Sequence, residues 1–259
     1  MKDTRLLDIF NQVRETLCRK DYYIHTSKKI LHVTNTEDMI PHLMGLQYIA
    51  RKEMFAGNKG VYMIKKERLR YSSIEKLIRK YYRKKEKQNS MIAMVRGKIE
   101  HLACIKDMLS SYSMLYLYDV EQNPEMELKT DYLFVNQQDE LILQLGLIKP
   151  EHNWMKVYHC NSFMVDYKEN KDYDLHYRNL THKYEINKIV MEDKITKEKE
   201  VIYQSDKAIK REKEGIRKML VANEITPNEE LIDNILKLNM RSGQYNTMEM
   251  LKKKLDVFS

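Results

Sequence analysis

The sequence contains few of the residues that break secondary structure or cross-link a chain. Its 259 residues include 7 glycines, 4 prolines and 3 cysteines. So few glycines and prolines predict long helices and strands with short connections. Cys18, Cys104 and Cys160 are odd in number and far apart, which argues against a disulfide scaffold or a zinc site and favours a reducing compartment.

Long apolar runs are missing too. No stretch approaches the ~18 consecutive apolar residues of a membrane span, and Met1 to Asp8 lack the apolar block of a signal peptide. Glycine-rich phosphate loops, dinucleotide-binding glycines, nucleophile elbows and helical His-x-x-x-His pairs are also absent. These absences exclude a transporter and a secreted mini-protein, and they disfavour nucleotide hydrolysis, hydride transfer and zinc chemistry. We expect a cytoplasmic protein with no membrane partner.

Positive charge is in excess. There are 46 Lys and Arg against 38 Asp and Glu, a formal net charge of +8, and the pI is about 9.1. A basic balance favours nucleic acid or an anionic membrane as partner, and composition alone does not choose between them. Charged residues make up 32% of the chain, above the usual ~25%, so the core is lean and includes part of the 18 tyrosines.

Hydrophobic periodicity divides the chain into helical and strand-forming parts. Helical patterns cover residues 4–19, a segment from about residue 38 to 50, residues 72–87, and a stretch from Ser90 to about Leu109. Period-two patterns indicate strands at 22–33 (a pair, or one strand with a turn at Ser27), 113–120, 131–136, 140–148, 156–167, 181–191 and 201–204. From Asp206 onward the pattern is again helical.

This order predicts an α+β fold: N-terminal helices packed on a curved antiparallel sheet of four to six strands, with a small helical C-terminal appendage. We place the boundary near residue 204, giving a domain over 1–204 and an appendage over 205–259. The appendage is a candidate docking segment for a protein partner or inhibitor.

His42 is the most suggestive titratable residue. It lies in Ile40-Pro41-His42-Leu43-Met44-Gly45, near the expected start of a helix, where the positive helix end would favour a neutral imidazole that acts as a base. Gly45 leaves room for a substrate or another backbone. The alternative is a buried histidine that caps a turn.

Asn161 and Ser162 form a second candidate group. In a regular strand, Val157, His159, Asn161, Phe163 and Val165 share one face, and Tyr158, Cys160, Ser162 and Met164 share the other. A hydroxyl among apolar neighbours needs a hydrogen-bond partner, either a phosphate oxygen or a backbone carbonyl. A bulge at Asn161 and Ser162 would let both side chains reach one site.

Basic residues alternate with tyrosines between residues 65 and 87. Lys80, Arg83 and Lys84 are candidate phosphate contacts, and Tyr71, Tyr81 and Tyr82 could stack on unpaired bases. An ordinary solvated helix whose tyrosines face the core explains the pattern equally well.

Several of these blocks resemble a known family in the same order. His42-Leu43-Met44-Gly45-Leu46 resembles the His-Leu-Thr-Gly-Ile/Leu block of the phage-associated barnase–EndoU–colicin–RelE-like nucleases, the fourth type in particular. Residues 60–77, residues 161–164 (similar to a Pro-Asn-Ser-Leu-Leu block) and residues 186–194 follow, so the resemblance covers roughly residues 20–195. Met44 stands where Thr is usual, Cys160 where Pro is usual, and Val165 near a common Lys.

The resemblance implies helices followed by a curved antiparallel sheet and a metal-independent ribonuclease without cofactors. Such proteins act as toxins or effectors in conflicts among phages, mobile elements and hosts. The RNA's 2′-OH would be the nucleophile, with tRNA or another structured RNA as substrate. His42 would be the base or acid, Asn161 and Ser162 would bind the phosphate, and Tyr158 or His159 would be the second proton-transfer group.

Lys156 or Arg178 would offset the phosphate charge. The competing interpretation is a catalytically inactive RNA- or protein-binding module on the same fold, such as a phage or host-defence inhibitor. Met44 and Val165 favour that alternative, whereas His42 together with Ser162 favours an active enzyme.

Overall fold

The computed structural model describes residues 3–50, 52–122, 128–138, 140–150, 157–168 and 180–242. Its helices are α1 (Arg5–Val13), α2 (Ile40–Leu43), α3 (Lys52–Phe55), α4 (Gly57–Lys65), α5 (Ile74–Tyr81), α6 (Lys85–His101), α7 (Ile105–Ser110), α8 (Asp206–Ala222) and α9 (Glu229–Ser242). The strands are β1 (Lys20–Thr26), β2 (Ile30–Val33), β3 (Met114–Leu117), β4 (Tyr132–Gln137), β5 (Leu141–Ile148), β6 (Val157–Tyr167), β7 (Lys183–Asp193) and β8 (Lys199–Gln204).

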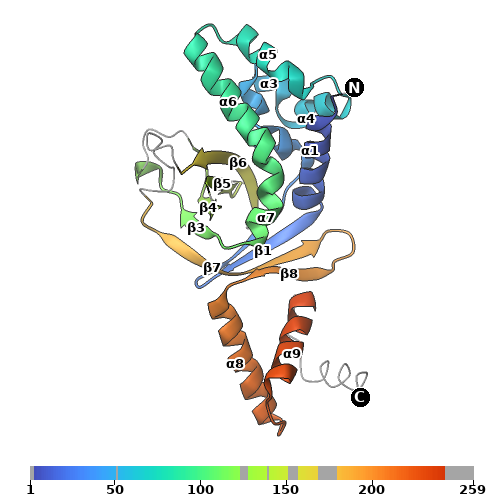
Figure 1. The fold of residues 1–259 in the computed structure, drawn as a ribbon, viewed down its shortest axis with the longest axis vertical. Helices are drawn as coiled ribbons and strands as arrows, with labels where there is room; N and C mark the ends of the chain where they lie inside the picture. The colour runs from blue at the N-terminus through green and yellow to red at the C-terminus, as the bar shows by residue number, and fades with distance from the viewer. Residues whose placement is uncertain are drawn as a thin grey trace.

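The strands close into a barrel. Neighbours follow the order β1-β2-β6-β5-β4-β3-β7, and β7 pairs back with β1, so seven strands complete the ring and β8 adds to the outside of β7. All pairs are antiparallel except β2–β6, which is parallel. Helices α2 to α6 gather at one end of the barrel, and α8 and α9 lie on the other side, beyond β7 and β8 (Figure 1).

The predicted curved antiparallel sheet of four to six strands is therefore wrong. The individual strands were located closely, including a strand pair within residues 22–33. Hydrophobic periodicity does not reveal that β1 pairs with β7 or that β2 pairs with β6. Each of these pairings joins segments more than a hundred residues apart. These two long-range pairings turn a sheet with edges into a closed barrel.

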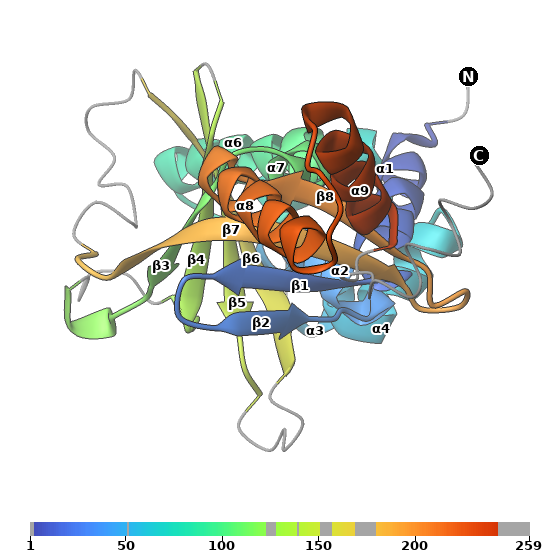
Figure 2. The same ribbon diagram turned by 90° about the horizontal axis from the view of Figure 1, so that it is seen from below.

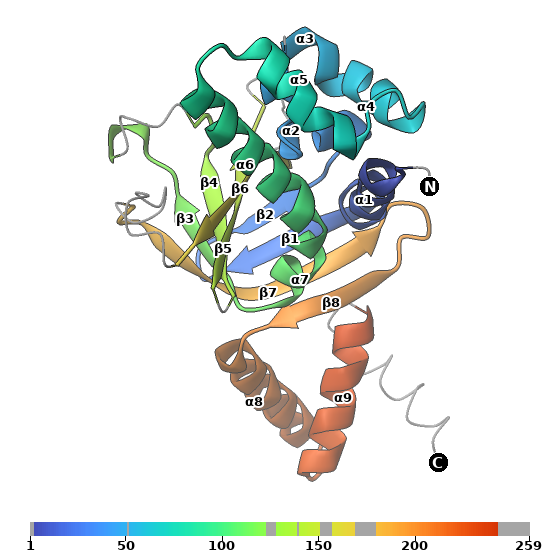
Figure 3. The same ribbon diagram turned by 45° about the horizontal axis from the view of Figure 1, so that its top comes forward.

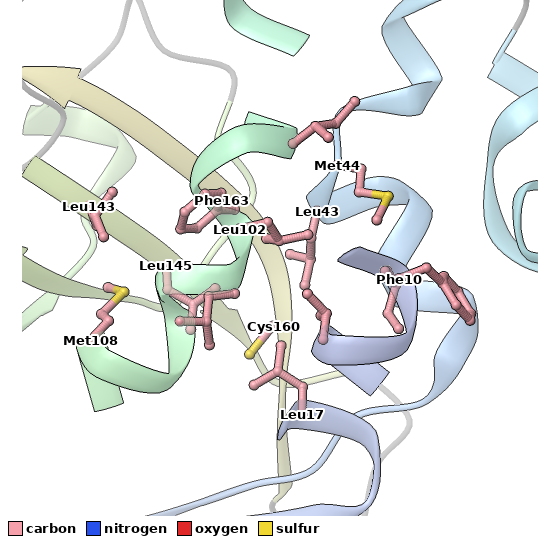
Figure 4. Close-up of a cluster of buried hydrophobic side chains, with 14 of the residues drawn as sticks. Phe10, Leu17, Leu43, Met44, Leu102, Met108, Leu143, Leu145, Cys160 and Phe163 are labelled. Atoms are coloured by element: carbon pink, nitrogen blue, oxygen red, sulfur yellow. The ribbon is translucent and has the colours of Figure 1, made fainter. Parts of the chain in front are cut away.

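The barrel interior is apolar and is closed by helices. Phe134, Leu145 and Phe163 lie opposite one another across β4, β5 and β6, so they share a face, and each is at most 2% exposed. Leu17, which follows α1, and Leu109 of α7 belong to the same buried cluster. Figure 3 shows α7 in front of β1 and β7 with α1 to one side of them, and Figure 4 shows part of the cluster.

Two helix boundaries differ from the sequence prediction. The helix expected across residues 38–50 ends at Leu43, and Gly45 two residues later has a left-handed φ of +76°. The helix expected over 72–87 ends at Tyr81, and α6 begins at Lys85 instead of near Ser90. Gln88 explains the second break, because its side-chain amide donates to the backbone carbonyls of Arg79 and Tyr82 and so caps the end of α5.

The two C-terminal helices form a small cluster of their own. Ile216, Leu220, Ile232, Ile235 and Leu236 are buried between α8 and α9. Helix α9 also packs on β8, and both helices lie across β7 and β8 in Figure 2. The predicted helices of the tail are thus present as far as Ser242. No helix in the described part of the chain is long and apolar enough to cross a membrane.

Phe163→Ala tests whether the barrel interior holds the fold together. Phe163 is 0% exposed, so truncation should lower the free energy of unfolding by about 3–5 kcal/mol through lost burial and a cavity. The control Ile195→Ala changes a side chain that is 76% exposed and should stay within about 0.5 kcal/mol of wild type. Urea unfolding followed by circular dichroism measures both, and equal midpoints for the two variants would contradict the interior packing.

Candidate functional site

Strand β6 has one edge that is only partly paired. Among the described residues it pairs with β2 at two positions, His32–Val157 and Val33–Tyr158, so beyond Tyr158 this edge is no longer covered by a strand. Helices α2 and α6 pack against β6 instead. A buried strand edge needs partners for its backbone groups, which these helices and their connections provide.

Two contacts fix the segment from Asn35 to Gly45, which includes α2, against β6. At one end, Asn35 Oδ1 accepts a hydrogen bond from the Cys160 backbone N–H at 2.8 Å. At the other end, a Cβ on Gly45 would lie 3.1 Å from Lys98 Cδ, and the Lys98 ammonium interacts electrostatically with Asp166. The chain from Asn35 to Gly45 therefore runs beside β6 from Cys160 towards Asp166.

His42 lies inside this aligned segment. Ile40, Leu43 and Met44 are at most 1% exposed, whereas His42 is half-buried and so occupies the more accessible side of α2. Helix α2 is only four residues long, and His42 is in its last turn. The long helix expected to follow His42 is absent, and the imidazole lies close to both ends of α2 instead of at the start of an extended helix.

Strand β6 contains a bulge, which was one of the two alternatives that the sequence allowed for Asn161 and Ser162. Gly146 pairs with Ser162, but Leu147 pairs with Cys160, so Asn161 is an extra residue without a direct partner on β5. The bulge interrupts the regular alternation expected for this strand. Cys160 and Phe163 both face the barrel interior, and Ser162 shares the outer face with Gly146.

The bulge is held tightly around Gly146. The Asn161 side-chain amide donates to the backbone carbonyl of Lys129, while Asn161 Oδ1 is buried and has no hydrogen-bond partner among the described residues. A Cβ on Gly146 would lie 2.8 Å from Asn161 Oδ1 and 3.2 Å from Ser162 Cβ. The missing side chain of Gly146 is thus what allows Asn161 and Ser162 to occupy these positions.

The two candidates for a second proton-transfer group lie in different places. His159 is on the outer face with Ser162, and its Nδ1 is 2.6 Å from the Thr34 carbonyl oxygen. Tyr158 faces the interior and lines a pocket of about 250 Å³ at the barrel end with Tyr132, whose ring centroid is 5.6 Å away. Burial and the neighbouring Tyr132 raise the pKa of Tyr158 to about 12, so this phenol stays protonated at neutral pH.

The predicted basic contacts lie at the other end of α6 from Lys98, which packs beside Gly45. Lys80, Arg83 and Lys84 are exposed at the turn between α5 and α6. Thirteen residues of α6 separate Lys85 from Lys98, which at 1.5 Å per residue is about 20 Å. Lys156 and Arg178, the predicted charge-offsetting residues, lie outside the described residues.

Sequence reasoning missed a buried lysine beside this segment. Lys98 is 6% exposed, its Nζ lies 5.6 Å from the ring centroid of Tyr48, and its partner Asp166 accepts a hydrogen bond from the Gln144 amide. Burial lowers the pKa of Lys98 from 10.5 to about 8, and Asp166 opposes this shift. The sequence offered one signal for this burial: Lys98 follows the buried Val95 by three residues, so both lie on the same face of α6.

Comparison with known proteins identifies the family. A family profile described as phage-Barnase-EndoU-ColicinE5/D-RelE like nuclease 4 matches residues 5–208. The chain belongs to this family. Neither curated proteins nor solved structures gave a match.

The match to this phage nuclease family spans α1 to β8 and the first residues of α8, so it contains α2, the bulge in β6 and the whole barrel. It confirms the resemblance inferred from the blocks at His42 and Asn161, and it supports a nuclease-like function acting on nucleic acid. In the described ranges, no group of three or more His, Cys, Asp or Glu side chains is arranged to hold a metal ion.

Lys98→Met tests the buried charge. Between pH 8 and 10.5 the unfolded chain keeps a proton that folded Lys98 has released, so the free energy of unfolding should rise with pH, by at most about 3 kcal/mol. The variant should be more stable than wild type at pH 7 and should lose this rise.

Urea unfolding at pH 7 and pH 9.5 measures the difference between wild type and Lys98→Met. Lys106→Met, which replaces an exposed lysine, is the matched control and should follow wild type at both pH values. Parallel pH profiles for wild type and Lys98→Met would mean that Lys98 titrates normally.

Proposed function

We propose that the protein is a metal-independent endoribonuclease that cleaves RNA through the RNA's own 2′-OH. A base removes the 2′-OH proton, donors stabilise the charge that develops on the phosphorus oxygens, and an acid protonates the leaving 5′-oxygen. The products carry a 2′,3′-cyclic phosphate and a 5′-hydroxyl. DNA lacks the nucleophile and is not cleaved.

The observation that carries this proposal is the alignment of the His42 segment with the bulged part of β6. The half-buried imidazole belongs to α2, the half-buried Ser162 hydroxyl belongs to the outer face of β6, and these two elements pack together. We assign His42 as base or acid and Ser162 with Asn161 as phosphate ligands. His159 is the better candidate for the second proton transfer, because it shares the outer face with Ser162 and Tyr158 does not.

The sequence departures from the family blocks lie away from this outer face. Met44 is 0% exposed, Cys160 is 1% exposed in the interior, and Val165 packs against the interior cluster. Changes at these positions alter core packing, so they give little reason to regard the outer face as inactive. Lys98 also supplies a cation near the Asp166 end of the segment, which favours activity despite the missing lysine near Val165.

A catalytically inactive binding module is the second candidate function. Two proposed catalytic side chains already bind backbone groups of the protein, which favours this alternative. His159 Nδ1 contacts the Thr34 carbonyl, and the Asn161 amide donates to the Lys129 carbonyl. In either case we propose tRNA or another structured RNA as ligand, a role in conflict between phages or mobile elements and their hosts, and residues 205–259 as the segment for a protein partner or inhibitor.

Cleavage of purified total RNA in EDTA tests the enzyme proposal. Wild type should produce 2′,3′-cyclic phosphate ends, and His42→Ala should lose about 10²–10⁴-fold in rate, the usual size of acid–base assistance. Ser162→Ala should also be slower, because a phosphate hydrogen bond is lost. His182→Ala, which removes an exposed histidine outside the segment, should retain wild-type activity.

Two outcomes would contradict the enzyme. Absence of cleavage by correctly folded wild type favours the binding module, provided RNA is still bound in a manner that weakens as salt rises. Equal cleavage by wild type and His42→Ala would remove His42 from the mechanism and point to a contaminating nuclease.

A further inference from the structure

A polar cavity of about 310 Å³ lies where the end of α1, the β2–α2 connection and the end of β7 meet. It is open to solvent on one side and is lined by Arg14, Cys18, Arg19, Asn35, Thr36, Glu37 and Lys194. None of these residues has been given a role in the proposed reaction. The cavity is large enough for several water molecules, which occupy about 30 Å³ each in the liquid, and therefore for a polyatomic ion.

Asn35, one of the residues that line this cavity, carries an unused donor. The side chain is 1% exposed, and its Oδ1 is fixed by the hydrogen bond from the Cys160 N–H at 2.8 Å. That bond determines the orientation of the carboxamide, so Nδ2 is directed away from Cys160. Nδ2 is buried and has no hydrogen-bond partner among the described residues. A buried amide donor in this state requires an acceptor that the protein does not supply.

The cavity wall is predominantly cationic. Arg14 Nε is also buried and without a hydrogen bond in the described part of the chain, although Arg14 Nη2 and Arg19 Nη1 contact Glu15 at 2.9 and 3.0 Å. Lys194 Nζ donates to the Asn35 carbonyl oxygen at 2.9 Å and lies 3.5 Å from Asp21. Three cations line this space, and two unused donors, Arg14 Nε and Asn35 Nδ2, belong to its lining residues.

Glu37 is the one carboxylate among the lining residues. Its charge is compensated by an ion pair with Lys65, and its other oxygen is 3.9 Å from Arg14 Nε, too far for a hydrogen bond. Among the lining residues, three cations therefore stand against one carboxylate, and two of these residues carry N–H groups without a hydrogen bond in the described part of the chain. This arrangement matches a tetrahedral oxyanion, because guanidinium and amide N–H groups bind phosphate oxygens through short charge-assisted hydrogen bonds.

We propose that this cavity is a phosphate-binding site. Its ligand is either a backbone phosphate of a bound nucleic-acid strand or a free phosphate. The strand assignment rests on the proposed function, since Glu37 and His42 are five residues apart in consecutive helical turns, about 8 Å along the axis. A strand whose scissile phosphate reaches His42 would then place a neighbouring phosphate against Asn35 and Arg14.

Phosphate binding is tested without reference to catalysis. Isothermal titration calorimetry with inorganic phosphate should give saturable binding to wild type. Asn35→Asp keeps an oxygen for the Cys160 N–H but replaces the amide donor with an anionic oxygen, so it should weaken phosphate binding at least tenfold. Arg19→Gln changes a half-exposed side chain, which protects the fold, and should weaken binding several-fold.

The control is Arg79→Gln, which removes an equally charged surface residue paired with Glu75 in α5 and should bind phosphate as wild type does. Thermal unfolding of each variant verifies that the fold is retained. If wild type shows no saturable binding, or if folded Asn35→Asp and Arg19→Gln both bind like Arg79→Gln, the site is overturned.

A single-stranded DNA oligonucleotide, which the proposed enzyme cannot cleave, distinguishes the two sources of phosphate. If a strand supplies the ligand, inorganic phosphate competes with the oligonucleotide, and Asn35→Asp weakens the binding of both. If phosphate binds without competition, the ligand is free phosphate, and the site stands while the strand assignment fails. Because neither result depends on RNA cleavage, an inactive wild type would refute the ribonuclease and leave this site in place.

Discussion

The short pairing between β2 and β6 is the constraint on which the rest of the site depends. Within the described ranges, two residue pairs join β2 to β6, and the edge of β6 after Tyr158 has no strand partner. The buried N–H of Cys160 is satisfied by Asn35 instead, and α2 and α6 cover the rest of the edge. A longer β2 would have placed a strand where α2 now lies, and His42 would be elsewhere.

The bulge at Asn161 is the second consequence of this edge. An extra residue lets Cys160 and Phe163 both enter the interior, so the strand keeps its core contacts while Asn161 and Ser162 are displaced towards the outside. Gly146 makes the displacement possible, since a side chain there would collide with Asn161. Residues that matter for packing and residues available for chemistry therefore alternate along a single strand.

Two of the buried polar groups without a hydrogen bond lie on or beside the same strand. Asn161 Oδ1 and Asn35 Nδ2 both lack hydrogen bonds in the described structure, and both side chains are attached to β6 or bonded to it. Lys98 adds a cation that burial makes costly to keep charged. Folded proteins rarely retain such groups without a use, because each lowers the stability of the native state.

The sequence by itself determined the local structure and the family. Periodicity located the strands, including the pair within residues 22–33 and the edge strand near residue 201, and short blocks at His42 and Asn161 carried the resemblance that the family match confirms. The same blocks named the residues of the candidate site, since a motif lists residue types in order without needing their positions in space.

Only the tertiary structure decided how these elements combine. Barrel closure depends on β1 meeting β7 and β2 meeting β6, and pairings between distant segments leave no periodic signal in either one. Lys98 and Asn35 look like ordinary polar residues in the sequence, and they acquire their importance because other segments bury them. Tyr158 was separated from Ser162 for the same reason, as one inserted residue reverses which side chains face the core.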